Sequence, residues 1–174
     1  MTKNDETTQQ VQGWFAGRLP NEWFAGAPEV TTDRDEILVV GILPEPEYPA
    51  DATDETRAAA REARIQGFRE DTRAQRMRIA DEAERRFGRK VSWGARTGAD
   101  RRLFTTLSVP AMTRLRLPER QVLDTLVDAG VARSRSHALA WCVRLVAERQ
   151  EEWLADLRNA LKAVEAVRSD GPRD

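Results

Sequence analysis

The residues of this chain that could do chemistry are few, and most of them are arginines. The 174-residue sequence holds one histidine, His137, and one cysteine, Cys142. They lie close together on one expected helix, so they cannot supply the cluster of His and Cys ligands that binds zinc within a chain. The stretches WFAGRLP and WGARTGAD lack the spacing and the lysine of a phosphate-binding loop. No carboxylate stands alone in an apolar setting, where a catalytic acid is expected. We therefore expect no enzyme, no metal and no cofactor.

The segment from Met112 to Val146 holds the arginines with the most informative spacing. It reads MTRLRLPERQVLDTLVDAGVARSRSHALAWCVRLV. Its first part, Thr113–Leu117, alternates as a short strand does. Side chains on successive strand residues point to opposite faces. One face would carry Thr113, Leu115 and Leu117, and the other Met112, Arg114 and Arg116.

Two helices are predicted after this strand. Pro118 stands at the usual first position of a helix, and the helix is expected to run to about Ala129. Gly130 is a stop signal. A second helix follows, with Ser134 or Ser136 as its N-cap.

This order of elements resembles the ribbon-helix-helix family of DNA-binding proteins, the Arc and methionine-repressor superfamily. The resemblance is carried by TRLRLP at the strand and by GVARSRSHALAWCV at the turn and second helix, within residues 112–147. It implies an intertwined homodimer. The two copies of Thr113–Leu117 would pair as an antiparallel ribbon and lie in the major groove of DNA.

The outward face of such a ribbon would contact bases. A two-stranded ribbon fits the major groove, and arginine donates bidentate hydrogen bonds to guanine O6 and N7. Arg114 and Arg116 are the candidates for these contacts, with Met112 as a third. The alternative is a strand face that is merely solvated.

The resemblance also implies a phosphate clamp at the start of the second helix. Ser134, Arg135 and Ser136 match that position, and Arg133 could add charge. Free backbone amides at a helix N-terminus form an anion site together with the helix dipole. The alternative is an ordinary capped helix, for which Ser134 alone is sufficient.

Two features depart from the family pattern. The family strand usually lies near the N-terminus, whereas here residues 1–112 precede it and an expected hairpin runs almost into it. If Thr113–Leu117 pairs within its own chain, the ribbon cannot form. His137 stands where relatives often have an acid, and we interpret it as a surface residue.

The second helix is expected to continue well beyond the family module. About 33 residues would give a helix near 50 Å long. Such a helix cannot bury its apolar stripe alone, so we expect it to pack on another long helix or on a partner chain. The expected dimer core consists of Leu115, Leu117, Leu123, Leu126, Leu139, Cys142 and Val146.

The first half of the chain predicts a separate β unit. Residues 1–11 are polar and are expected to form a disordered tail. Residues 12–50 predict a small acidic β unit, with Trp14–Leu19 as a candidate strand and Glu36–Leu43 as the strongest one. The repeated stretch WFAG predicts a small aromatic core, with partner docking by an exposed half of each pair as the alternative. The residues concerned are Trp14, Phe15, Trp23 and Phe24.

The rest of the organisation follows from helix and turn signals. Residues 51–89 predict one long Arg-rich helix, Asp54–Phe87, ended by Gly88. Residues 90–110 predict a β-hairpin, and residues 111–170 the ribbon-helix-helix-like module. The expected fold class is α+β and predominantly helical, with a small N-terminal β unit, a β-hairpin and a C-terminal ribbon-helix-helix-like module with an extended second helix.

The net charge of −1 conceals an uneven distribution. Met1–Thr56 holds 12 acidic and 3 basic residues, whereas Arg57–Arg120 holds 8 acidic and 17 basic ones. A basic face for a polyanion is one interpretation. Packing of the acidic segment on the basic one is the other.

Together these patterns favour a cytoplasmic, dimeric, sequence-specific DNA-binding protein that regulates transcription. DNA and a second copy of the chain are the expected partners, a further protein could bind the acidic N-terminal unit, and no membrane association is expected. The alternative is a non-enzymatic adaptor that contacts RNA, the ribosome or the transcription machinery through the basic central helix.

Overall fold

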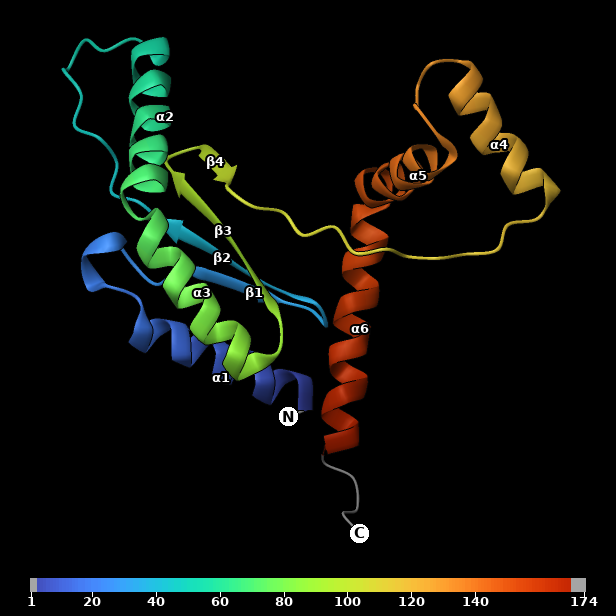
Figure 1. The fold of residues 1–174 in the computed structure, drawn as a ribbon, viewed down its shortest axis with the longest axis horizontal. Coiled ribbons are helices and arrows are strands. Elements are labelled where there is room, and N and C mark those ends of the chain that lie inside the picture. The colour runs from blue at the N-terminus through green and yellow to red at the C-terminus, as the bar shows by residue number, and fades with distance from the viewer. Residues whose placement is uncertain (1–2, 170–174) are drawn as a thin grey trace. The chain divides into compact units, whose positions relative to one another are not determined.

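The computed structural model describes residues 3–169, which form two compact units. The first comprises Lys3–Val109 and the second begins at Pro110 (Figure 1). The fold is α+β, as expected, with a four-stranded sheet in the first unit and helices in both. Among the described residues, no helix is both long and apolar enough to cross a bilayer.

The sheet of the first unit joins two segments that sequence analysis assigned to separate units. Its strands are β1 (Glu29–Thr32), β2 (Glu36–Ile42), β3 (Lys90–Thr97) and β4 (Asp100–Leu103), in the order β1-β2-β3-β4. The pairs β1–β2 and β3–β4 are antiparallel, whereas β2 and β3 are parallel. The predicted strand at Glu36 and the predicted hairpin are therefore confirmed. The parallel pairing joins the predicted β unit, helix and hairpin into one unit, Lys3–Val109.

The N-terminal helix α1 (Lys3–Arg18) replaces two predictions. The disordered tail is wrong for residues 3–11, and residues 1–2 lie outside the described part. The candidate strand Trp14–Leu19 is also wrong, because the chain is helical to Arg18. Gly13 and Gly17 lower helix propensity, but Val11, Phe15 and Leu19 recur at four-residue spacing and are buried. Their burial outweighs the local preference.

The predicted single helix of residues 54–87 is two helices, α2 (Asp54–Asp71) and α3 (Arg73–Phe87). The break lies at Thr72, whose hydroxyl donates to the carbonyl of Phe68. A threonine that bonds back to the preceding turn bends helices. The predicted stop is confirmed, since Gly88 caps α3 with a φ of 66°, in the left-handed region that glycine adopts readily.

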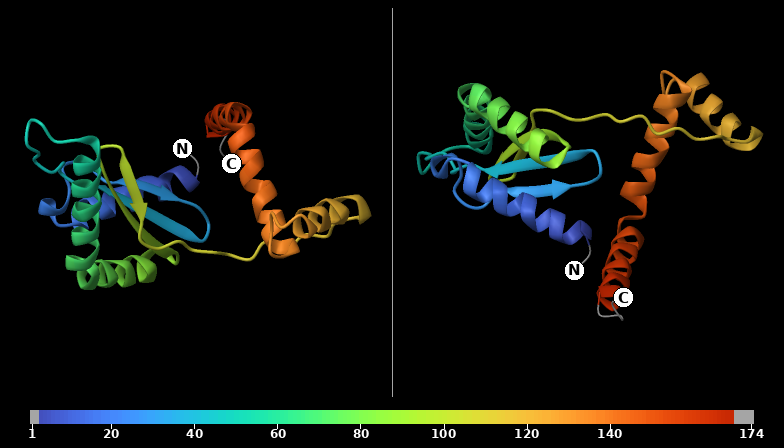
Figure 2. Two further views of the ribbon diagram at one scale, coloured as in Figure 1. Left: turned by 90° about the horizontal axis from the view of Figure 1, so that it is seen from above. Right: turned by 60° about the horizontal axis from the view of Figure 1, so that its bottom comes forward.

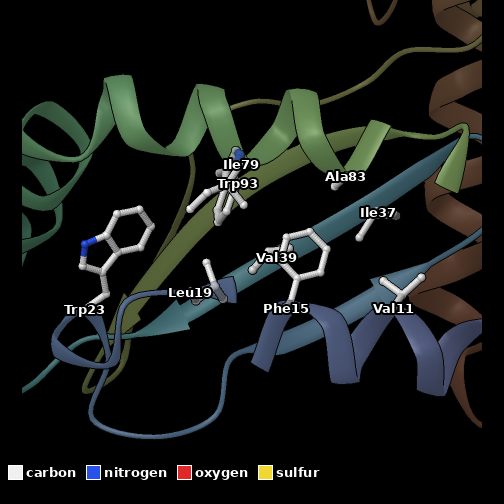
Figure 3. Packing of buried hydrophobic residues seen from close by; sticks show 9 residues of the cluster. All are labelled: Val11, Phe15, Leu19, Trp23, Ile37, Val39, Ile79, Ala83 and Trp93. Carbon is white, nitrogen blue, oxygen red and sulfur yellow. The ribbon is translucent and has the colours of Figure 1, made fainter. Parts of the chain in front are cut away.

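The two Trp-Phe pairs belong to the core, as predicted. Phe15 is fully buried and Trp23 nearly so. They pack with the β2 residues Ile37 and Val39 and with Trp93 of β3 (Figure 3). The helix α3 adds Ile79 and Ala83 to the same cluster, so α1 and α3 both pack against this sheet face. Trp14 and Phe24 are partly buried at its margin.

The second unit consists of α4 (Leu117–Asp128), α5 (Arg135–Arg149) and α6 (Glu151–Ser169). The single extended second helix of the prediction is wrong, because it breaks at Gln150 into α5 and α6 (Figure 2). Gly130 has a φ of 75° between α4 and α5, as expected of a helix stop.

Candidate nucleic-acid interface

A small apolar cluster holds the extended segment before α4 against the helices. Leu123, Ala132 and Ala138 are buried at its centre. Leu115 packs on this cluster from the segment preceding α4. The cluster thereby fixes one side of residues 113–116, the segment predicted as the ribbon strand. The other partly buried members are Leu126, Val127, Leu139 and Cys142.

The predicted ribbon strand is not a strand in the single chain. Residues 105–116 carry no regular secondary structure, and Leu117 is already the first residue of α4. Strand assignment needs a hydrogen-bonded neighbour, and none of the described residues forms such a strand pair with residues 113–116. Pairing of Thr113–Leu117 with the preceding hairpin, which would prevent a ribbon between two chains, is not found among the described residues. One contact anchors the segment, because Arg120 Nη1 donates to the Leu115 carbonyl at 2.7 Å.

The three candidate base-contacting residues lie on the solvent side of this segment. Arg114 and Arg116 are exposed, and Met112 is 98% exposed. Across residues 3–169, neither arginine side chain forms an ion pair or a hydrogen bond with another residue. Leu115 between them is half-buried, but Thr113 and Leu117, the other residues of the predicted inward face, are exposed. The predicted alternation of an inward and an outward face therefore holds only at Leu115.

The start of α5 is a capped helix terminus. Ser134 is the N-cap, and its hydroxyl accepts a hydrogen bond from the backbone N–H of His137 at 3.3 Å. In return, His137 Nδ1 accepts from the backbone N–H of Arg133 at 3.2 Å. This reciprocal arrangement resembles a capping box, with histidine at the position that usually holds Glu or Gln. His137 is therefore a capping residue, which the sequence interpretation as a surface residue missed.

The candidate phosphate-contacting residues differ in their availability. Ser136 and Arg133 are exposed at the helix start. Arg135 is engaged, because its Nε and Nη2 donate to both carboxylate oxygens of Asp124 at 2.6 Å. This hydrogen bonding lowers the pKa of the Asp124 carboxyl and raises the pKa of Arg135. Arg135 would have to leave Asp124, or be shared with it, to contact a phosphate.

A shallow groove of about 370 Å³ runs between the extended segment and the helices. Met112 and Thr113 line one side of it, and Arg120, Arg135 and Ser136 line the other. Of the candidate contacts, Met112, Arg135 and Ser136 therefore border this depression, whereas Arg114 and Arg116 do not line it.

The predicted dimer core is placed in two parts. Five of its members lie in or on the apolar cluster, namely Leu115, Leu123, Leu126, Leu139 and Cys142. Leu117 and Val146 are 59% and 49% exposed instead. Val122, Val131 and Val143 are exposed as well. The second unit thus presents many large apolar side chains to solvent.

A second arginine-rich feature lies in the first unit, on the helices predicted as the basic central helix, but the cavity that its arginines line was not predicted. Arg69, Arg73 and Arg76 line a cavity of about 620 Å³ together with Trp93 and Phe104. Arg76 is only 5% exposed. Its guanidinium lies 4.9 Å from the centre of the Phe104 ring and 5.9 Å from that of Trp93, a cation–π geometry.

Backbone and hydroxyl acceptors satisfy the buried Arg76. Its Nη2 donates to the carbonyl of Arg69 at 2.6 Å and its Nε to the Thr72 hydroxyl at 2.9 Å. Burial, with a smaller effect of the charges on Arg69 and Arg73, lowers the pKa of Arg76 to about 10. The side chain therefore stays cationic at neutral pH and closes the helix break at Thr72. Arg76 interrupts a run of apolar residues at helical spacing, which includes Phe68 and Ile79. This interruption is the sequence signal that could have indicated its burial.

Comparison with known proteins divides the chain at the same place as the structure. The family model described as "Rv1265-like protein, N-terminal domain" matches residues 9–103, and the model described as "Mb1296 C-terminal domain" matches residues 116–168. Neither description names the ribbon-helix-helix family. The chain is 60% identical over 159 residues to the uncharacterized proteins Mb1296 of Mycobacterium bovis and Rv1265 of Mycobacterium tuberculosis. These matches cover 91% of this chain and 69% of each relative. No solved structure matches.

Proposed function

This chain belongs to the Rv1265-like family, and we propose that it is a dimeric, sequence-specific DNA-binding protein that regulates transcription. Two copies of residues 113–116 would pair as an antiparallel ribbon and place Arg114 and Arg116 in the major groove. The protein would act in the cytoplasm and without catalysis. Its first unit would serve as a brace or as a docking site for a protein partner.

This proposal rests on one observation, which is that two arginine side chains are exposed and available for contacts. Arg114 and Arg116 are exposed and have no acidic partner among the described residues, while Leu115 between them is anchored to the helices. The carbonyls of Leu115 and Arg116 accept from Arg120, but the backbone N–H groups of residues 113–116 bond to none of the described residues. A short extended segment with such free groups is suited to pairing with an identical segment. Guanidinium groups on the outer face can then donate to guanine O6 and N7.

The exposed apolar surface of the second unit supports dimerisation. Of the large hydrophobic residues that are exposed, 11 belong to residues 110–169 and 3 to residues 3–109. Exposed apolar surface of this extent is typical of a site at which proteins associate. An intertwined dimer would cover Leu117, Val122 and Val146, which lie on α4 and α5.

The test compares two pairs of arginine substitutions on one DNA duplex. The duplex is one that the wild-type protein selects from a random-sequence library. Arg114→Ala/Arg116→Ala is expected to weaken binding at least about 100-fold, because each bidentate contact is worth about 1–3 kcal/mol. Fluorescence anisotropy over a salt series measures the affinity and its salt dependence.

A matched pair removes the same charge elsewhere in the unit. Arg144→Ala/Arg149→Ala changes two exposed arginines of α5 and is expected to leave selective binding within about threefold, since it touches no base in the proposed mode. Equal losses in both variants would contradict the ribbon as the reader. So would failure of the wild-type protein to select any duplex.

One specific observation supports the alternative function as an adaptor. The cavity between α3 and β3 presents Arg69 and Arg73, for which no ion pair exists among the described residues, beside the cationic Arg76. RNA contact through this basic surface would be weakened by Arg69→Ala/Arg73→Ala and unaffected by Arg114→Ala/Arg116→Ala. The two variants therefore discriminate the two functions in one binding experiment.

A further inference from the structure

The helix α6 carries an exposed apolar face along its length. The residues that form it are separated by four, four, three and three positions, which places them on one side of an α-helix. They are 42–74% exposed. We call this face the α6 stripe: Trp153, Leu157, Leu161, Val164 and Val167.

The charges of α6 are divided along its axis. The first seven residues, Glu151–Leu157, contain three acids and no base. The remaining twelve contain the bases Arg158, Lys162 and Arg168 and a single acid, Glu165. The helix is therefore acidic at its beginning and basic towards its end. Two such helices attract each other when they run in opposite directions and repel at their ends when they run in the same direction.

The sizes of the stripe residues favour the same orientation. Leu157 and Val164 are seven residues apart, and so are Trp153 and Ala160, which gives a heptad pattern. In an antiparallel pair, Leu157 would face the partner's Ala160 and Trp153 would face the partner's Val164. Each large side chain then meets a smaller one, as close packing requires. A parallel pair would set Trp153 against Trp153 and Ala160 against Ala160.

We propose that α6 pairs in antiparallel orientation with α6 of a second copy of this chain. The occupant is fixed by the charge division and the size pattern, both of which are self-complementary only in this orientation. The contact uses α6, whereas the proposed ribbon and its dimer use residues 113–149. It is therefore an additional interface, and it does not depend on DNA binding. With both interfaces, the chain would form a pair of dimers that can hold two DNA sites together.

The first experiment measures molar mass by sedimentation equilibrium over a concentration series. Val164→Glu places a charge in the α6 stripe at a side chain that is 56% exposed, so the substitution does not disturb a folded core. Asn159→Glu adds the same charge on the opposite, polar side of α6. Wild type and Asn159→Glu are expected to have twice the molar mass of Val164→Glu. Equal masses for all three proteins would overturn the proposal, whatever the mass is.

The second experiment tests the orientation by disulfide formation in a Cys142→Ala background. A Trp153→Cys chain and a Val164→Cys chain are mixed under mild oxidation. A disulfide is expected in the mixture and in neither chain alone, because only the antiparallel pair brings these positions together. Cross-linking of either variant with itself, or none in the mixture, would overturn the antiparallel pair. DNA binding plays no part in the readout, so failure of the proposed regulator leaves both results intact.

Discussion

Among the described glycines, Gly41 leaves the least room for an added methyl group. A Cβ atom there would lie 1.8 Å from Cε1 and 2.3 Å from Cζ of Phe24. The Phe24 ring itself packs against Trp23 and Phe68, with ring centres 6.0 Å and 5.5 Å apart. Because cores are close-packed, the ring cannot move aside without displacing its neighbours. The aromatic residues of the repeated stretch WFAG thus require glycine on β2.

We predict that Gly41→Ala destabilises the protein by about 1–3 kcal/mol through overpacking. Gly67→Ala is the matched control. Gly67 lies in α2 with no atom within 4 Å of an added Cβ, so alanine there is expected to stabilise by about 0.5–1 kcal/mol. Urea denaturation of the three proteins measures both shifts. Shifts in the same direction would contradict the packing argument.

Single residues were predictable where their role is local. Ser134 as a helix cap and Gly88 as a helix stop follow from neighbouring positions, and both predictions are confirmed. The ion pair between Arg135 and Asp124 and the burial of Arg76 depend on how helices meet in space. No spacing rule within one helix reveals such contacts.

At the scale of elements, one ion pair fastens α1 to α3. Arg18 Nε and Nη2 donate to the two carboxylate oxygens of Glu82 at 2.6 Å and 2.7 Å. A bidentate contact of this kind is stronger than an ordinary neutral hydrogen bond. It lowers the pKa of the Glu82 carboxyl. The helix that sequence patterns missed is therefore attached by charge as well as by its buried side chains.

We predict a pH dependence from this contact. Since the pKa of Glu82 is lower in the folded state, its stabilising effect is complete above the unfolded value of about 4.3. The effect is lost as the pH falls through the lower folded value. Glu82→Gln should therefore be less stable than wild type at pH 7, and the difference should shrink on acidification. Urea midpoints from pH 7 to pH 2.5 measure it.

The control for that measurement is Glu55→Gln, at an exposed position in the first turn of α2. It should show a small difference from wild type at every pH. A gap between wild type and Glu82→Gln that stays constant down to pH 2.5 would contradict the proposed origin of the stability.

Elements with strong local signals were predicted, and those defined by tertiary contacts were not. β2, the hairpin and the starts of α4 and α5 follow from apolar runs, turns, Pro118 and capping residues. The helix α1 contains two glycines, and the breaks at Thr72 and Gln150 interrupt otherwise continuous helical patterns. The helix α1 becomes visible only when the distant strands that bury its side chains are in place. The break at Thr72 arises from a local hydrogen bond to Phe68 that the sequence pattern does not reveal.

At the scale of the whole molecule, the chain consists of two units joined by residues without regular secondary structure. The boundary at Val109 agrees with the limits of the two family matches, residues 9–103 and 116–168. Sequence analysis predicted a division at the same place, between the hairpin of residues 90–110 and the module of residues 111–170. Arg114 and Arg116 lie in the connecting segment and are exposed.

We predict that trypsin at a low ratio cuts first after Arg114 or Arg116, because extended, exposed chain enters a protease more readily than helix does. Mass spectrometry of early fragments identifies the site. The selected duplex should slow this cut and leave later cuts in α6 unchanged. First cuts within α2 or α3 would contradict the division into units.

The parallel pairing of β2 with β3 has a consequence for synthesis. Ile37 cannot meet Val91, its register partner, until both helices between the strands have left the ribosome. During that interval, β1 is the only neighbouring strand that β2 has, and α3 is not yet available to cover Ile37 and Val39. Late-arriving contacts of this kind slow folding and expose aggregation-prone chain. The nascent first unit is therefore expected to leave the apolar run of β2 without its parallel neighbour until β3 (Lys90–Thr97) has emerged, before the second unit is made.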